Sequence, residues 1–180
     1  MILSEILFDS ERIQHRVGEL GKEISRDYSG KDLVVVGILK GAVIFLSDLV
    51  RRIDGTVGVA LDFMAVSSYG DSTNTSGIVR ILKDLDSSIR GKHVLIVEDI
   101  VDTGLTLSYL VKMMHEREPE SVHVCALLDK KERRKIEVAV RYTGFVIPDY
   151  FVVGYGLDYS GRWRNVPSIH VVVPERGENA

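Results

Sequence analysis

The sequence predicts an α/β fold with a mainly parallel sheet, and three observations support this prediction. Continuous apolar runs, typical of strands buried on both faces of a parallel sheet, occur at residues 33–38, 94–97 and 122–128. Segments with helical periodicity alternate with these runs along the chain. The segments that connect these strands and helices are rich in Gly, Ser, Thr and Asp, which are common in tight turns.

The spacing of apolar residues predicts two helices before residue 55. Ser10 can cap a helix that runs to about Tyr28 and turns one apolar stripe inward: Ile13, Val17, Leu20 and Ile24. The strand at 33–38 leads through a turn containing Gly into a second helix over 42–52. We expect the inward face of this helix to be Val43, Leu46, Leu49 and Val50.

The middle of the chain contains two short strands and a long polar segment. The strands are predicted at 57–64 and 78–82. Residues 65–77 are dense in Ser, Thr, Asn, Asp and Gly, which predicts a long mobile loop, and such loops in compact domains are usually functional. A turn at 84–91 leads into the central strand at 94–97. A third helix is expected from near Leu105 to before Pro119, with an inward face of Leu107, Leu110, Val111 and Met114.

The last third of the chain begins with a strand at 122–128 and a basic run, KKERRK, that starts at Lys130. A basic run is usually a solvated surface, but Lys130 follows a strand end, where ligands bind in open α/β sheets. Short extended pieces are expected at 138–140, 145–147 and 151–153, and a closing strand at 169–173.

Bulk properties indicate one globular domain of 180 residues, with 45% hydrophobic and 27% charged residues. The net charge of −3 gives no general attraction to nucleic acid or to an acidic membrane. A lone cysteine, Cys125, excludes an internal disulfide framework and favours a cytoplasmic protein. The N-terminal segment lacks the basic region of a signal peptide, and no apolar stretch approaches the roughly 20 residues of a membrane span.

Three carboxylates follow the central strand, at Glu98, Asp99 and Asp102, directly before the small residues that lead into the third helix. A loop at a helix N-terminus presents free N–H groups that suit a phosphate. Carboxylates beside a phosphate would repel it unless a divalent cation or a ribose diol lies between them. The alternative interpretation is a plain strand–helix turn in which the acids cap the helix.

This stretch resembles the ribosyl-diphosphate signature of the type I phosphoribosyltransferases: an apolar strand, two acids, two apolar residues, Asp-Thr-Gly and Thr. Other segments resemble the hypoxanthine (guanine) phosphoribosyltransferases of bacterial type, namely Leu39-Lys40-Gly41, Ser68-Tyr69, Lys130, IPDYFVVGYGLDY at 147–159 and Arg164. The resemblance covers roughly residues 33–173. Ser67 departs from it, because some members carry Lys there, and the N-terminal segment is short.

The resemblance implies a type I phosphoribosyltransferase fold in a single domain over 1–180. It divides the chain into a core at about 30–130, a hood formed by the N-terminal segment and about 140–175, and a mobile loop at 65–79. The implied activity is purine salvage: hypoxanthine, and also guanine, reacts with 5-phospho-α-D-ribosyl 1-diphosphate (PRPP) to give IMP or GMP and diphosphate.

The resemblance also assigns roles around the ribosyl diphosphate. Glu98 and Asp99 would hold the ribose hydroxyls, and Mg²⁺ would be bound by Glu98, Asp99 and Asp158. The 5-phosphate would lie against Thr103, Gly104, Leu105 and Thr106. The diphosphate would contact Lys40, Gly41 and Arg164, under a lid containing Ser68 and Tyr69. For Arg164 a surface ion pair is the alternative. The Leu39–Lys40 peptide is expected to be cis, although no proline is involved.

On the purine side, the resemblance makes Asp102 the general base that takes the N7 proton. Lys130 would donate to the 6-oxo group and exclude a 6-amino base. Phe151 would stack on the ring, and the backbone at Val152 and Asp158 would read its far edge. For Phe151 and Val152 the alternative is core packing.

Three other functions compete with this interpretation: a xanthine-preferring transferase, a PRPP-sensing regulator that binds RNA, and a Mg²⁺ phosphohydrolase. The charge of −3 argues against the RNA-binding regulator. A phosphohydrolase would leave Lys130 and residues 151–158 without a role, and there is no GxxxxGK[ST] loop. The expected partners are small-molecule substrates and a second copy of the chain, in a homodimer or homotetramer, without nucleic acid or membrane. The sequence does not rank hypoxanthine, guanine and xanthine.

Overall fold

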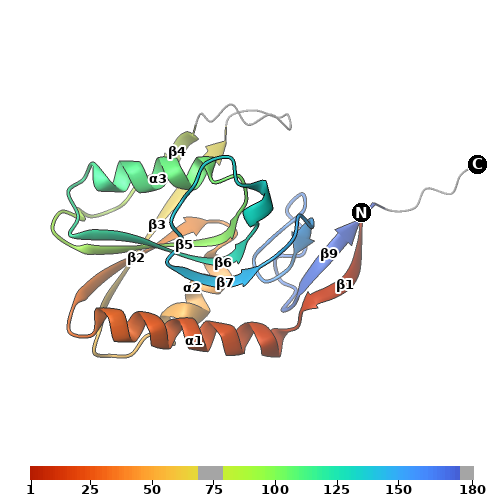
Figure 1. The fold of residues 1–180 in the computed structure, drawn as a ribbon, viewed down its shortest axis with the longest axis horizontal. Helices are drawn as coiled ribbons and strands as arrows, with labels where there is room; N and C mark the ends of the chain where they lie inside the picture. The colour runs from red at the N-terminus through yellow and green to blue at the C-terminus, as the bar shows by residue number, and fades with distance from the viewer. Residues whose placement is uncertain (69–78, 175–180) are drawn as a thin grey trace, which may run out of the picture.

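The computed structural model describes residues 1–68 and 79–174, which form two β-sheets and three α-helices (Figure 1). In chain order the elements are β1 (Ile2–Phe8), α1 (Ser10–Tyr28), β2 (Asp32–Leu39), α2 (Val43–Val50), β3 (Gly58–Ser68), β4 (Val79–Lys83), β5 (His93–Val101), α3 (Leu105–His115), β6 (Ser121–Asp129), the 3₁₀ turn η1 (Lys131–Arg133), β7 (Tyr142–Val146), β8 (Val152–Val153) and β9 (Ile169–Val173).

The larger sheet has the strand order β4-β3-β2-β5-β6-β7, and every strand except β4 runs parallel to its neighbour. Its centre is β5, where Val94 to Val97 are fully buried between β2 and β6. Helices cover both faces, which is why these strands are apolar at every position. The α/β prediction with a mainly parallel sheet is therefore confirmed.

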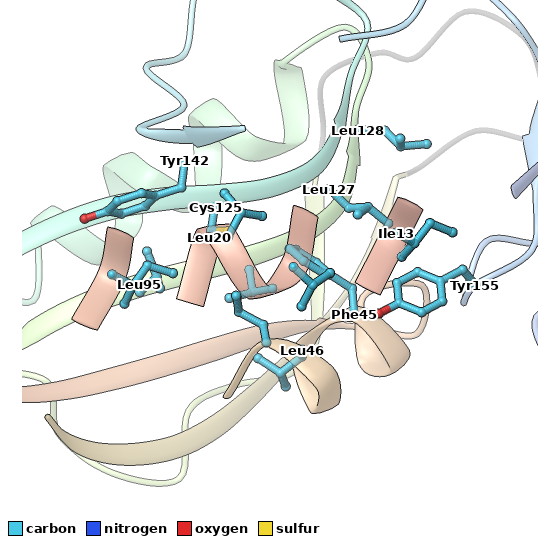
Figure 2. Packing of buried hydrophobic residues seen from close by; sticks show 14 of the residues in the cluster. Ile13, Leu20, Phe45, Leu46, Leu95, Cys125, Leu127, Leu128, Tyr142 and Tyr155 are labelled. Carbon is cyan, nitrogen blue, oxygen red and sulfur yellow. The ribbon is translucent and has the colours of Figure 1, made fainter. Parts of the chain in front are cut away.

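Alternate residues of the strands supply two separate cores. On one face Leu33, Leu95 and Cys125 pack with α1 and α2, and Figure 2 shows Ile13 and Leu20 of α1 in the same cluster as Phe45 of α2. The opposite face packs against α3. The period of two along each strand separates the two sets, and it fixes the register of the sheet.

A smaller antiparallel sheet, β1-β9-β8, lies beyond one end of the larger sheet, and the N-terminus is in it (Figure 1). Its strand β1 was not predicted. The first five of its seven residues are exposed, so the segment lacks the apolar pattern of a core strand. Pairing with β9, more than 160 residues away, supplies its hydrogen bonds.

Four local predictions were wrong. Asp9, not Ser10, caps α1, because its carboxylate accepts a hydrogen bond from the Arg12 N–H at 2.8 Å. In α2, Phe45 is buried where Val43 was expected, and Val43 is 38% exposed. β3 continues to Ser68 because β4 pairs with it, so the predicted loop begins later than residue 65. Residues 138–140 form no strand.

Within residues 1–68 and 79–174, none of the helices is long and apolar enough to cross a membrane.

Candidate active site

The carboxyl ends of β2, β5 and β6 meet at one edge of the larger sheet. Strand order reverses between β2 and β5, because β3 continues on one side and β6 on the other. Open α/β sheets bind ligands at such a reversal. This edge brings together Lys40 after β2, the acids of β5 and Lys130 after β6. The Leu39–Lys40 peptide is cis, as expected.

A cavity of about 580 Å³ opens at this edge. Six of the predicted site residues line it: Asp99, Asp102, Lys130, Phe151, Val152 and Asp158. A second hollow of about 130 Å³ shares Ile100 and Asp102 with the cavity, and it is also lined by Glu98, Thr103, Gly104 and Thr106. Two predicted groups of residues, one for a base and one for a phosphate, thus line two spaces that share Asp102.

The two acids at the end of β5 are strongly desolvated. Oε2 of Glu98 is buried and has no hydrogen-bond partner. Burial, with a smaller contribution from the neighbouring Asp99 charge, raises the pKa of Glu98 well above its usual range. Burial also raises the pKa of Asp99 to about 6, although the Ile100 N–H donates to its Oδ1 at 2.7 Å. Glu98 Oε2 therefore has no partner, and the Ile100 N–H and the Arg164 charge offset the burial of Asp99 only in part.

The small hollow lies at the start of α3. Gly104 occupies the N-cap position with a φ of 81°, a left-handed conformation that favours glycine, and no side chain caps the helix. The first turn of a helix leaves N–H groups without intrahelical acceptors, and the helix dipole adds positive potential. This end of α3 has the properties of an anion site, with Thr103 and Thr106 hydroxyls beside it.

Charged side chains that line the larger cavity form a connected group of ion pairs. Nζ of the buried Lys130 lies 3.3 Å from Asp149 Oδ1. Arg133 bridges two acids, with Nε 2.9 Å from Asp102 Oδ1 and Nη1 3.0 Å from Asp149 Oδ2. Neither Arg133 nor Asp149 was predicted. The signal for Arg133 was the position of the basic run, directly after a strand that ends at the site, and Asp149 lies in the segment 147–159 that carries the family resemblance.

The residues predicted to contact the diphosphate have different surroundings. Gly41 lies against the acids: a Cβ there would be 1.5 Å from Asp99 Oδ2. Arg164 is tied to the hood side, since its Nη1 donates to the Gly156 carbonyl at 2.6 Å and its Nη2 is 2.5 Å from Asp158 Oδ1. The Gly156 α-carbon in turn packs closely on the Gly41 carbonyl. A surface ion pair was the alternative role for Arg164. An ion pair is present, but its partner, Asp158, is itself a predicted site residue.

Four predicted site residues remain: Lys40, Leu105, Ser68 and Tyr69. Lys40 is exposed, and neither it nor Leu105 lines either hollow. Ser68 ends β3, and Tyr69 lies outside the described residues.

Phe151 presents an aromatic face to the cavity. It is 48% exposed, whereas the next residue, Val152, is buried in β8. The Val172 N–H of β9 donates to the Phe151 carbonyl at 2.9 Å, and Tyr159 packs edge-on against the ring at 5.6 Å between centroids. The ring is therefore fixed in position while one of its surfaces stays open to a ligand. Core packing, the alternative for Phe151, is wrong, but it holds for Val152.

In the part of the chain that the structure describes, no group of three or more His, Cys, Asp or Glu side chains could hold a metal by itself. Glu98, Asp99 and Asp158 thus do not form a closed metal cage.

The fold and this site define a phosphoribosyltransferase. A family model described as a phosphoribosyl transferase domain matches residues 4–160. Within that class, the chain belongs to the hypoxanthine-guanine phosphoribosyltransferases. It is 52% identical over 165 residues to the enzyme of that name from Dictyostelium discoideum, which covers 91% of this chain and 92% of that protein. To the Bacillus subtilis protein of the same name it is 48% identical over 172 residues, covering 96% and 94% of the two chains.

Solved structures agree with this assignment. A hypoxanthine phosphoribosyltransferase from Staphylococcus aureus superimposes with a TM-score of 0.93 at 48% identity, covering 98% of this chain and 95% of that one. A Bacillus anthracis hypoxanthine-guanine phosphoribosyltransferase gives a TM-score of 0.91 at 45% identity, covering 96% and 100%. The type I phosphoribosyltransferase fold is therefore confirmed. These relatives give no support to the alternatives of a xanthine-preferring enzyme or an RNA-binding regulator.

Proposed function

We propose that this protein transfers the phosphoribosyl group of PRPP to hypoxanthine, and also to guanine, and releases diphosphate. One observation carries the proposal most directly: Lys130, Asp102 and Phe151 line a single cavity that shares Asp102 with the hollow at the start of α3. A cation, a carboxylate and an aromatic ring suit a 6-oxopurine, and the start of a helix suits a phosphate.

The purine side of the reaction needs a base and a donor. As N9 of the purine attacks ribose C1, the N7 proton becomes acidic, and Asp102 accepts it as general base. Lys130 donates to the 6-oxo group, and its burial strengthens this hydrogen bond. A 6-amino group would direct N–H toward the Lys130 cation, so adenine is rejected. Phe151 stacks on the ring, and the backbone at Val152 and Asp158 reads the 2-position.

The phosphate side anchors the substrate. The hydroxyls of Thr103 and Thr106 and the backbone N–H groups of Gly104 and Leu105 bind the 5-phosphate at the start of α3. Gly41 and the cations of Lys40 and Arg164 contact the diphosphate, where negative charge grows as its bond to C1 breaks. Ser68 and Tyr69 belong to a lid that excludes water from the cation-like ribose.

The desolvated acids fit a Mg²⁺ ion that arrives with PRPP. Oε2 of Glu98 is a buried acceptor without a partner, and burial raises the pKa of Asp99, so a cation bound here would stabilise both charges. Because the protein alone offers no closed cage, Glu98, Asp99 and Asp158 would complete a set of ligands supplied partly by the ribose and the diphosphate, as Mg²⁺ commonly prefers. When bound, the ion neutralises charge on the leaving diphosphate.

Three further parts of the proposal concern the whole chain. The smaller sheet and residues 140–175 act as a hood over the base, while residues 30–130 form the core. The enzyme works as a homodimer or homotetramer. Its buried lone thiol, Cys125, suits the reducing cytoplasm.

The test is an absorbance assay with PRPP and each of five bases: hypoxanthine, guanine, xanthine, adenine and uracil. We expect Mg²⁺-dependent turnover with hypoxanthine and guanine that EDTA abolishes. Turnover of adenine or uracil in preference to the 6-oxopurines would contradict the role of Lys130. Absence of turnover with all five bases would contradict the proposed function itself.

A further inference from the structure

Three consecutive carbonyl groups of the loop before α3 are held by one other segment, residues 130–136. The Val101 carbonyl accepts from the Lys130 N–H at 2.9 Å. The Asp102 carbonyl accepts from Arg134 Nη1 at 2.8 Å. The Thr103 carbonyl accepts from the Lys135 and Ile136 N–H groups at 2.9 and 3.2 Å.

This arrangement determines where the N–H groups of the loop point. In a planar trans peptide the N–H is directed opposite to the preceding C=O. Since the carbonyls of Val101, Asp102 and Thr103 face the segment 130–136, the N–H groups of the three following residues face away from it. The small hollow at the start of α3 is lined by residues of this same loop.

Arg134 provides the only side-chain contact in this set. Its Nη2 pairs with Oδ1 of Asp129, the last residue of β6, and the two side chains are only 8% and 4% exposed. One guanidinium therefore joins the end of β6 to the loop after β5. The fit is close, because a Cβ on Gly104 would lie 2.4 Å from the Ile136 carbonyl and 3.2 Å from Arg134 Cδ.

We propose that Arg134 is a positioning residue for the 5-phosphate: it holds the Asp102 carbonyl, and so turns the Thr103 N–H of the phosphate-binding loop away from the segment 130–136. This inference rests on the proposed function. Arg134 lines neither the larger cavity nor the small hollow. Its charge is neutralised by the buried Asp129, so its effect comes from the planar fork that satisfies two acceptors at once, which a lysine cannot reproduce.

The experiment compares two ligands that differ only by the 5-phosphate, IMP and inosine, by calorimetric titration. The variants are Arg134→Gln, Arg134→Lys and Asp129→Asn. Lys135→Gln is the matched control, because it removes an exposed positive charge from the same segment and leaves the backbone N–H in place. We expect the first three variants to lose affinity for IMP by about tenfold to a hundredfold, the effect of a misplacement of order 1 Å, with inosine unchanged.

The outcomes separate the inference from the function on which it rests. Wild-type protein that binds IMP no more tightly than inosine would contradict the phosphate site itself. Wild-type preference for IMP that persists unchanged in Arg134→Gln would overturn the role of Arg134. An equal loss in Lys135→Gln would also overturn it, since net charge would then be responsible. If Arg134→Gln does not fold, the double variant Asp129→Asn/Arg134→Gln removes both buried charges and allows the same comparison.

Discussion

Replacing Asp99 with Asn should make the ligand-free protein more stable at neutral pH and inactive. Asp99 is ionised at pH 7 in a site that raises its pKa from 3.8 to about 6, chiefly by desolvation. The difference of about 2.2 pKa units corresponds to about 3 kcal/mol at about 1.36 kcal/mol per unit. Asn keeps the Oδ1 acceptor that the Ile100 N–H uses, so the substitution removes the charge and little else.

The sign of the pH dependence follows from proton binding. Between pH 3.8 and about 6 the folded protein holds a proton on Asp99 that the unfolded chain has released, so the contribution of this group to stability falls as pH rises through that window. The stability difference between Asp99→Asn and wild type should thus rise from about 0.6 kcal/mol at pH 4 to about 3 kcal/mol at pH 7. This value is an upper bound, because water can enter the site.

The assay is urea unfolding in EDTA at several pH values, followed by circular dichroism. Glu120→Gln is the control, since it removes an exposed carboxylate outside the site and should not reproduce the curve. A stability difference that does not change with pH, or an Asp99→Asn protein less stable than wild type at pH 7, would refute the reasoning that the charge of Asp99 is buried without full compensation.

Three other substitutions test the site. Asp102→Asn should lower kcat by about 10²–10⁴-fold, the usual contribution of a general base, and leave the KM for PRPP nearly unchanged; a fall in kcat of less than tenfold would exclude the role. Gly41→Ala should lower kcat/KM for PRPP because its Cβ would lie 1.5 Å from Asp99 Oδ2, whereas Gly55→Ala, which meets nothing within 4 Å, should behave as wild type. Lys130→Gln should lower kcat/KM for hypoxanthine by about tenfold to a hundredfold, the effect of losing a charged hydrogen bond, and should reduce the ratio of kcat/KM for hypoxanthine to that for adenine. An unchanged ratio would contradict the proposed hydrogen bond from Lys130 to the 6-oxo group.

The sequence predicts the centre of the molecule better than its periphery. The core strands are recognisable because burial on both faces requires apolar residues at every position, as in Val94 to Val97. Asp102 and Lys130 were found for a related reason, since each follows such a strand and parallel strands end at one edge.

The parts that were missed depend on contacts between distant segments. β1 is an edge strand whose partner, β9, lies at the other end of the chain, so its own residues carry no strand pattern. Arg133 and Arg134 belong to a short irregular segment, and in the sequence they look like the exposed lysines beside them. Only the fold brings these two arginines to Asp102, Asp129 and Asp149.

We propose that one nucleotide spans the two hollows that share Asp102, and a crystal structure with bound IMP and Mg²⁺ would show whether it does. We expect the 5-phosphate at the start of α3 against Thr103 and Thr106, the 6-oxo group within hydrogen-bond distance of Lys130 Nζ, and the purine ring on Phe151. A nucleotide bound in the reverse orientation, or outside these two hollows, would refute this binding mode.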